Sequence, residues 1–303
     1  MFLELLQQSG LSFDRLQSFC MVAQAGGITR AAKGDPAKQS LFSRQVKELE
    51  EFFGTELIRR KGRGISLTEA GERLNVVARE CFASLTDFKS ECTGQPVEVV
   101  VGAGDSIIQW LLLPRLAEIR RRIPNVRLKF LNLATDDAVK RLADGLLDFV
   151  LVRRDAISRP LCPVSLGSMG YSLFLPAGLA SPSRSKSGLR VLDGLPLATL
   201  EGEGNFRSEL ARIAKRQRLK ISIHVECSSF PLAARAVTKG NVAAILPSIA
   251  AADLVEAGAA EVKLPFLRAF DREMCLASNA RLVRIRPALQ QVGTVLAQVC
   301  RFT

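Results

Sequence analysis

The sequence predicts a multi-domain α+β protein in which an amino-terminal helical module, a β-hairpin and a long helix precede a two-lobed α/β domain. Three observations support this fold class. A chain of 303 residues has room for about two domains, at about 150 residues each. Apolar residues recur at helical spacing through most of the first third, with one hairpin pattern between helices. From residue 97 onward short strands alternate with helices, which is typical of βαβ units and a mainly parallel sheet.

The composition indicates a globular protein without a membrane span. The sequence is 48% hydrophobic and 24% charged, as in an ordinary globular protein. No uncharged apolar stretch approaches the roughly 18 residues of a membrane span, and the first ten residues lack the basic segment of an export signal. The seven cysteines are dispersed without a CxxC pair, which favours a reducing compartment. We therefore expect a cytoplasmic protein without membrane contact.

Helices separated by glycine-containing turns are expected in the amino-terminal module. They cover about residues 13–25, 28–33 and 38–53. The last of them follows the turn Gly34-Asp35-Pro36 and is amphipathic. Its apolar face holds Phe42, Val46, Leu49 and Phe53. The opposite face is therefore polar and basic.

A hairpin and a long helix follow. Residues 57–67, here called the wing, contain two short apolar pieces around a basic, glycine-containing tip, the pattern of a β-hairpin. Thr68 can then cap a helix that runs to about Cys92. Small and apolar residues recur along this helix at steps of three and four, which favours pairing with another helix. The residues expected in that dimerisation seam are Leu74, Val77, Cys81 and Leu85.

Turn residues at 93–96 mark the boundary to the α/β part. We expect a DNA-binding domain at 1–67, a linker helix at 68–95, lobe 1 at 96–165 and 268–303, and lobe 2 at 166–267. Strands are expected at 97–101, 127–133, 149–152, 172–175, 197–200, 221–225, 242–246 and 274–277. The expected helices cover 110–123, 136–144, 207–217, 231–238 and 287–301, and residues 181–188 have the composition of a surface loop.

The polar face of the third helix and the wing form the strongest functional signal. Arg and Gln side chains on a helix suit guanine and adenine edges in the major groove, and lysines suit phosphates. Arginines on a hairpin can enter a minor groove or contact the backbone. The residues expected to contact DNA are Lys38, Gln39, Ser40, Ser43, Arg44, Lys47, Arg59, Arg60 and Arg63.

The alternative is that these charges simply form a solvated surface, as isolated charge runs usually do. Net charge does not decide the matter, because residues 1–95 hold 13 Lys and Arg against 12 Asp and Glu, whereas the whole chain carries +12. Local clustering of the charges favours DNA binding instead, since helix, turn and basic wing occur together here.

Short motifs of one known family recur along the chain. In the first third they are Ala31-Ala32, Ser43-Arg44-Gln45-Val46, Leu49-Glu50, Arg59-Arg60 and Leu67-Thr68-Glu69-Ala70-Gly71. Weaker ones follow in Leu112-Leu113-Pro114, Pro124-Asn125-Val126 and Lys239-Gly240-Asn241-Val242. With these motifs residues 13–92, and more weakly nearly the whole chain, resemble the LysR-type transcriptional regulators. Two departures, Gly34-Asp35-Pro36 and Lys38, predict an unusual turn before the recognition helix.

The resemblance implies a sequence-specific DNA-binding regulator that forms a dimer or tetramer and contacts RNA polymerase. It also implies a small-molecule effector, with no other cofactor, bound between two lobes similar to periplasmic binding proteins. Carried over by position, the effector cleft is lined by Asp105, Ser106, Thr135, Glu203, Phe206 and Ser228. Helix N-termini there favour an anion, whereas Asp105 opposes one, so the charge of the effector stays open. Simple helix capping is an equal alternative for Ser106 and Thr135.

Two other classes of function are alternatives. Gly104-Asp105-Ser106 resembles a hydrolase or dinucleotide-binding loop, but Ile107 replaces the third glycine and the single His224 lacks the aspartate that a hydrolase pattern needs. A cytoplasmic solute-binding protein would not need the DNA-binding module. We therefore expect no enzymatic activity and no metal site. His224, Trp110 and the free thiols are expected in the core.

Overall fold

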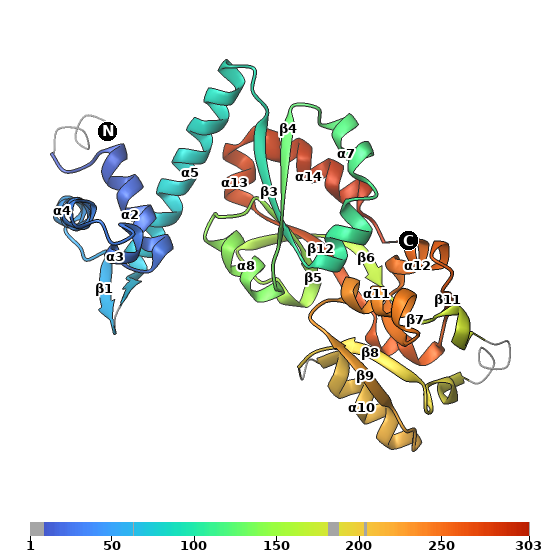
Figure 1. The fold of residues 1–303 in the computed structure, drawn as a ribbon. Helices are drawn as coiled ribbons and strands as arrows, with labels where there is room; N and C mark the ends of the chain where they lie inside the picture. The colour runs from blue at the N-terminus through green and yellow to red at the C-terminus, as the bar shows by residue number, and fades with distance from the viewer. Residues whose placement is uncertain (1–8, 63, 181–187, 203–204, 303) are drawn as a thin grey trace.

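The computed structural model describes residues 9–62, 64–180, 188–202 and 205–302. A small helical module is connected by one long helix to two α/β lobes (Figure 1). Arg63, Glu203 and most of the expected surface loop, residues 181–187, lie outside the described residues. Within the described ranges, no helix combines the length and the apolar character needed to cross a lipid bilayer.

The amino-terminal module packs helices against a two-stranded antiparallel wing. Its elements are α2 (Phe13–Ala25), α3 (Ile28–Ala31), α4 (Pro36–Phe53), β1 (Ile58–Lys61) and β2 (Gly64–Leu67). Buried side chains from α2 and α4, among them Phe19, Phe42 and Leu49, form its core. The expected apolar face of α4 is therefore buried up to Leu49, whereas Phe53 is 39% exposed because it lies in the last turn, beyond the core.

Helix α4 begins at Pro36 and not at the expected Lys38. The Asp35 carboxylate oxygen Oδ1 accepts the backbone N–H groups of Ala37 at 2.9 Å and Lys38 at 3.3 Å. Pro36 suits the first helical position because it has no N–H to satisfy. The Gly34-Asp35-Pro36 departure thus forms a regular, capped helix start.

The linker helix α5 (Glu69–Cys92) is capped by Thr68, as its sequence predicts. The Thr68 hydroxyl oxygen accepts the Gly71 N–H at 3.0 Å, and the hydroxyl donates to the Glu56 carbonyl at 2.7 Å. The first turn of α5 is therefore bonded to the chain that enters the wing.

Lobe 1 contains a five-stranded sheet of order β4-β3-β5-β12-β6. Its strands are β3 (Val97–Ala103), β4 (Val126–Asn132), β5 (Phe149–Arg153), β6 (Leu161–Met169) and β12 (Arg272–Asn279). β3 pairs in parallel with β4 and β5, whereas β12 pairs antiparallel with β5 and β6. Its helices are α7 (Leu116–Arg122), α8 (Thr135–Ala143), α13 (Ala280–Ile285) and α14 (Pro287–Val299). Apolar side chains on both faces of the sheet are buried, as expected for a sheet covered on each side.

Lobe 2 contains a second five-stranded sheet, of order β11-β7-β10-β8-β9. Its strands are β7 (Tyr171–Leu175), β8 (Pro196–Leu200), β9 (Ser222–Cys227), β10 (Ala243–Pro247) and β11 (Ala260–Val262). Its α-helices are α10 (Asn205–Gln217), α11 (Phe230–Gly240) and α12 (Ala251–Glu256). The 3₁₀ segment η6 (Pro265–Phe270) packs its Leu267 and Phe270 into the same lobe.

The chain crosses between the lobes near Gly170 and Asp271. Both crossovers lie a few residues beyond the expected boundaries at 166 and 268. Strand β6 extends the lobe 1 sheet to Met169, and Phe270 is buried in the lobe 2 core, which accounts for the shift. At this point Ser248 N–H donates to the Gly170 carbonyl at 2.9 Å.

The helix expected over residues 110–123 is instead broken. In its place the chain forms a π-helical turn η1 (Ile108–Leu112), which continues from α6 (Asp105–Ile107), and then α7, which begins at Leu116. Pro114 lies in the interruption, where it cannot donate a helical hydrogen bond. π-turns inside helices occur frequently at functional sites, and this one carries Trp110.

Candidate nucleic-acid interface and effector cleft

One face of α4 presents polar and cationic side chains to solvent. Lys38, Ser40, Ser43, Arg44 and Lys47 are exposed. A shallow hollow of about 590 Å³ runs along this face, and its lining residues are Ile28, Thr29, Gln39, Ser40, Ser43, Arg44 and Lys47. The exposed Thr29 is an addition to the expected set, brought there by the tight packing of α3 against α4. The sequence offered one signal for Thr29, namely a hydroxyl residue at the start of the helix that precedes α4.

The cations of this face have only loose intramolecular partners. Arg44 Nε lies 3.8 Å from Glu48 Oε1, and Lys47 Nζ lies 3.7 Å from Glu51 Oε1. The side chains of Arg44 and Lys47 are 70% and 76% exposed, and ion pairs at such exposed positions contribute about 0–1 kcal/mol. The guanidinium and ammonium groups can therefore leave these partners at little cost.

The wing carries Arg59 and Arg60, both exposed, on β1. Two contacts fix the wing to the helical module. The Glu50 side chain oxygen Oε1 accepts the N–H groups of Leu57 at 2.8 Å and Ile58 at 3.2 Å. On the opposite strand Ile65 N–H donates to the Gly26 carbonyl at 3.1 Å. Glu50 belongs to α4, so these bonds attach the wing directly to that helix.

The expected dimerisation seam lies on α5 and is only partly free. Val77 and Leu85 are 44% and 47% exposed, Phe88 is 64% exposed, and Cys81 is exposed. Leu74 is different, because it is half-buried against the core of the amino-terminal module. This packing within one chain removes Leu74 from the centre of the seam. The other four side chains, Val77, Cys81, Leu85 and Phe88, are of the kind that monomeric proteins normally bury, and they remain available for a partner.

The residues expected to bind the effector come soon after the ends of strands that are neighbours in each sheet. Ala103 pairs with Asn132, so Asp105 and Thr135 follow neighbouring strands at the same edge of the lobe 1 sheet. In lobe 2, Leu200 of β8 pairs with Cys227 of β9. The segment after β8, which contains Phe206, and the exposed Ser228 after β9 therefore leave the same edge of that sheet. Ligands bind α/β proteins at the carboxyl ends of the strands. The Phe206 side chain is not among those that the structure describes.

The two edges meet across the lobe boundary. α6, which contains Asp105 and Ser106, contacts α11 of lobe 2. Trp110, from the adjoining π-turn, is 4% exposed and packs into the lobe 2 cluster that includes Ala233 and Val237. Trp110 is thus a core residue, as expected, but the core that it completes belongs to the other lobe.

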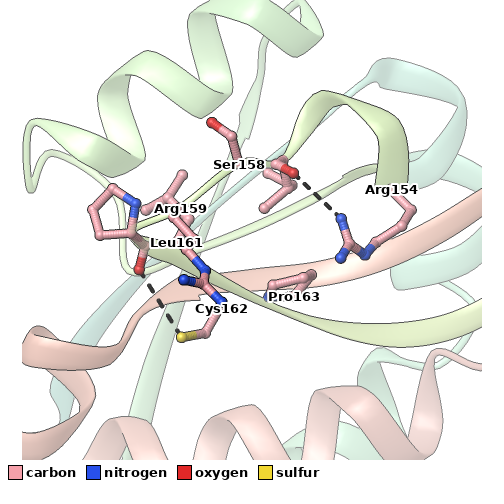
Figure 2. A pocket seen from close by; sticks show the side chains of 8 residues that line it. Arg154, Ser158, Arg159, Leu161, Cys162 and Pro163 are labelled. Carbon is pink, nitrogen blue, oxygen red and sulfur yellow. Dashed lines mark hydrogen bonds between the residues drawn. The ribbon is translucent and has the colours of Figure 1, made fainter.

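A separate hollow of about 560 Å³ lies at the connection between β5 and β6 (Figure 2). Arg159 and Cys162 are among its lining residues, and the Arg154 side chain donates to the Ile157 carbonyl at 3.3 Å. These residues lie outside the expected effector set. Within the described ranges no group of three or more His, Cys, Asp and Glu is arranged for a metal ion.

The expectation of a buried His224 and buried thiols is corrected in part. His224 is exposed on β9, where its Nε2 lies 3.0 Å from the Ser222 hydroxyl, because its side of this edge strand faces solvent. Cys81, Cys92 and Cys162 are exposed, whereas Cys20, Cys227, Cys275 and Cys300 are buried. Burial raises the pKa of the Cys275 and Cys300 thiols to about 11.

Two family descriptions match this chain. The LysR substrate binding domain matches residues 94–301, and the bacterial regulatory helix-turn-helix protein of the lysR family matches residues 13–72. The chain belongs to the LysR family. In this LysR-family protein the Leu49-Glu50 and Leu67–Gly71 motifs thus have a local explanation, since Glu50 and Thr68 bond the wing to α4 and α5.

A probable nitrogen assimilation transcriptional activator of Synechococcus elongatus is 35% identical over 146 residues. That alignment covers 47% of this chain and 47% of the relative, about half of its length. A full-length OxyR structure from Pseudomonas aeruginosa is 19% identical, with a TM-score of 0.66 over 96% of this chain and 95% of that chain. Full-length CbnR complexed with its target DNA is 20% identical, with a TM-score of 0.56 over 95% and 100% of the chains. These structures share the fold of this LysR-family protein.

Proposed function

We propose that this protein is a sequence-specific DNA-binding regulator of transcription, in which α4 enters the major groove and the wing contacts the adjacent backbone or minor groove. The exposed polar face of α4 carries the proposal. Gln39, Ser43 and Arg44 line one hollow there, and Arg and Gln can bind guanine and adenine edges through paired hydrogen bonds. Ser40 lines the same hollow. Lys38 and Lys47 are assigned to phosphates, and Arg59, Arg60 and Arg63 of the wing to the adjacent backbone or minor groove.

The proposed DNA-binding unit is a dimer formed through α5. Val77, Cys81 and Leu85 lie on one exposed side of that helix, and burying apolar surface there contributes roughly 25 cal/mol per Å². A two-fold pair would place its two α4 helices in successive major grooves, about 34 Å apart. The CbnR structure, which shares this fold, is a complex with target DNA.

The proposed effector is a small molecule bound where the sheet edges of the two lobes meet. Asp105, Ser106 and Thr135 would contact it from lobe 1, and Glu203, Phe206 and Ser228 from lobe 2. A ligand that binds one arrangement of the lobes more tightly shifts the population toward that arrangement. RNA polymerase is the further partner that an activator of transcription would contact.

Selection of bound DNA tests the central proposal. Purified protein is mixed with sheared DNA from its own source at about 150 mM salt, where nonspecific binding is weakened, and retained fragments are sequenced. Enrichment of a few sites with an interrupted palindrome supports specific regulation by a dimer. Uniform retention, equal to that of a Ser43→Ala/Arg44→Ala variant, contradicts it.

Emission from Trp110 tests the effector site, because it is the only tryptophan and lies between the lobes. Small organic acids and amines are titrated while the emission is followed. For any compound that shifts the emission, Thr135→Ala is expected to weaken binding, whereas Thr294→Ala, on the exposed side of α14, is not. Equal affinity of both variants would move the site elsewhere.

A further inference from the structure

A buried arginine joins the linker helix to lobe 1. Arg286 follows α13, and its side chain is 7% exposed. Its Nε lies 2.6 Å from Asp87 Oδ2 and its Nη2 lies 3.0 Å from Asp87 Oδ1, so the guanidinium binds that carboxylate through two bonds. Asp87 belongs to α5, and its side chain is 9% exposed.

Other residues of lobe 1 accept hydrogen bonds from the same guanidinium. Arg286 Nη1 donates to Asp148, which directly precedes β5, and Nη2 donates to the Glu98 carbonyl of β3 at 3.2 Å. Asp148 is held in turn, because its Oδ2 accepts the Val100 N–H at 2.7 Å. Strands β3 and β5 are thus joined to Asp87 of the linker helix through one guanidinium, which lies at the α13–α14 junction.

The second charged contact of α5 with this lobe is weaker. Glu80 lies two helical turns before Asp87 and is 3% exposed. Its Oε2 lies 2.7 Å from Arg281 Nε, but its Oε1 has no hydrogen-bond partner within the described part of the chain. Next to Glu80 a hollow of about 960 Å³ separates the wing and α5 from lobe 1, with Lys61, Lys140 and Arg281 among its lining residues.

We propose that Arg286 is the positioning residue that couples lobe 1 to the linker helix, and that α5 turns about Asp87 while the Glu80 end opens and closes. The inference rests on the proposed function, because it describes how a change in the lobes reaches the DNA-binding modules. Breaking a buried ion pair by separating its partners is costly, so Asp87 stays attached to lobe 1 and is the fixed point about which the rest of α5 changes its angle. The half-satisfied Glu80 loses little when its end of the interface opens, since water can then reach Oε1.

The test compares full-length Asp87→Asn with Glu91→Gln, a matched control on the same helix whose carboxylate is exposed. In Asp87→Asn the guanidinium keeps Asp148 and the Glu98 carbonyl, so lobe 1 is expected to fold. Hydrogen exchange of backbone amides in residues 84–92 is expected to accelerate about tenfold, while amides of β3 and β5 keep their wild-type rates. Glu80→Gln and Glu91→Gln are expected to leave both regions unchanged.

The DNA readout uses a fragment with two half-sites, taken from those that the wild-type protein selects, and a fragment with one half-site. Asp87→Asn is expected to bind the two-site fragment about tenfold more weakly and the one-site fragment within twofold, because only simultaneous contact requires a fixed linker. Wild-type exchange in residues 84–92 would overturn the proposal, and so would faster exchange in β3 and β5, which would make the cluster a folding contact of the lobe. If the wild-type protein selects no DNA, the proposed function fails, and the exchange measurement still decides the coupling.

Discussion

The carbonyl oxygen of Leu57 lies 2.0 Å from the position that a Cβ atom on Gly71 would occupy. Gly71 is buried in the first turn of α5, and Leu57 is the buried residue that leads into β1. Thr68 N–H donates to this same carbonyl at 3.1 Å. The root of the wing and the start of the linker helix therefore fit together only because residue 71 has no side chain.

Replacing Gly71 with alanine is expected to destabilise the amino-terminal module. The added methyl group must displace backbone and not a flexible side chain, and overpacking of this kind costs about 1–3 kcal/mol. Urea unfolding followed by circular dichroism measures the change. Gly104→Ala is the control, because a Cβ there meets no atom within 4 Å and φ is −70°. Equal stability of the two variants would contradict the geometry of this contact.

Arg44→Ala is expected to weaken binding to a selected DNA site by about 1–3 kcal/mol, with a smaller loss on random DNA, because a bidentate contact with a base is lost. Fluorescence anisotropy with both DNAs measures the difference. Arg121→Ala removes the same charge from an exposed position in lobe 1 and should leave both affinities unchanged. Equal losses on both DNAs would reassign Arg44 to a phosphate.

A double substitution of Val77→Asp and Leu85→Glu is expected to separate the dimer into monomers. Two charges would face a dry helix seam, where unpaired charges are costly. Sedimentation velocity measures the mass, and Val255→Asp, at a valine that is 52% exposed on lobe 2, is the control. Leu74 is not used, because it packs inside its own module and its replacement would mix unfolding with dissociation. An unchanged dimer would remove α5 from the interface.

Alkylation should divide the seven thiols into two groups. Cys81, Cys92 and Cys162 are exposed and are expected to react with iodoacetamide first. Burial raises the pKa of the Cys20, Cys227, Cys275 and Cys300 thiols, so less reactive thiolate is present at neutral pH. Mass spectrometry after timed quenching gives the order. Cys81 should also become protected at concentrations where the dimer forms, whereas Cys162 should not.

Local sequence signals predicted the elements that depend on local bonds. The wing, the Thr68 cap and the polar face of α4 follow from turn residues, a capping side chain and helical periodicity, none of which needs distant parts of the chain. The same signals missed β6 and β11, and they predicted one unbroken helix from Trp110 to residue 123. A π-turn carries no periodicity of its own, and Trp110 is fixed by contacts with lobe 2.

The sequence by itself determined the fold class, the polar helix α4 with its basic wing, and the residue types proposed to contact DNA. Each of these depends on patterns among residues that are close together in the sequence. Only the tertiary structure decided that Leu74 faces inward, that Thr29 joins the α4 surface, and that Asp87, Asp148 and Arg286 meet. The three charged residues lie far apart along the chain. Burial within a particular packing, and not spacing, gives a charged residue its partner, because only there is an unpaired charge costly enough to require one.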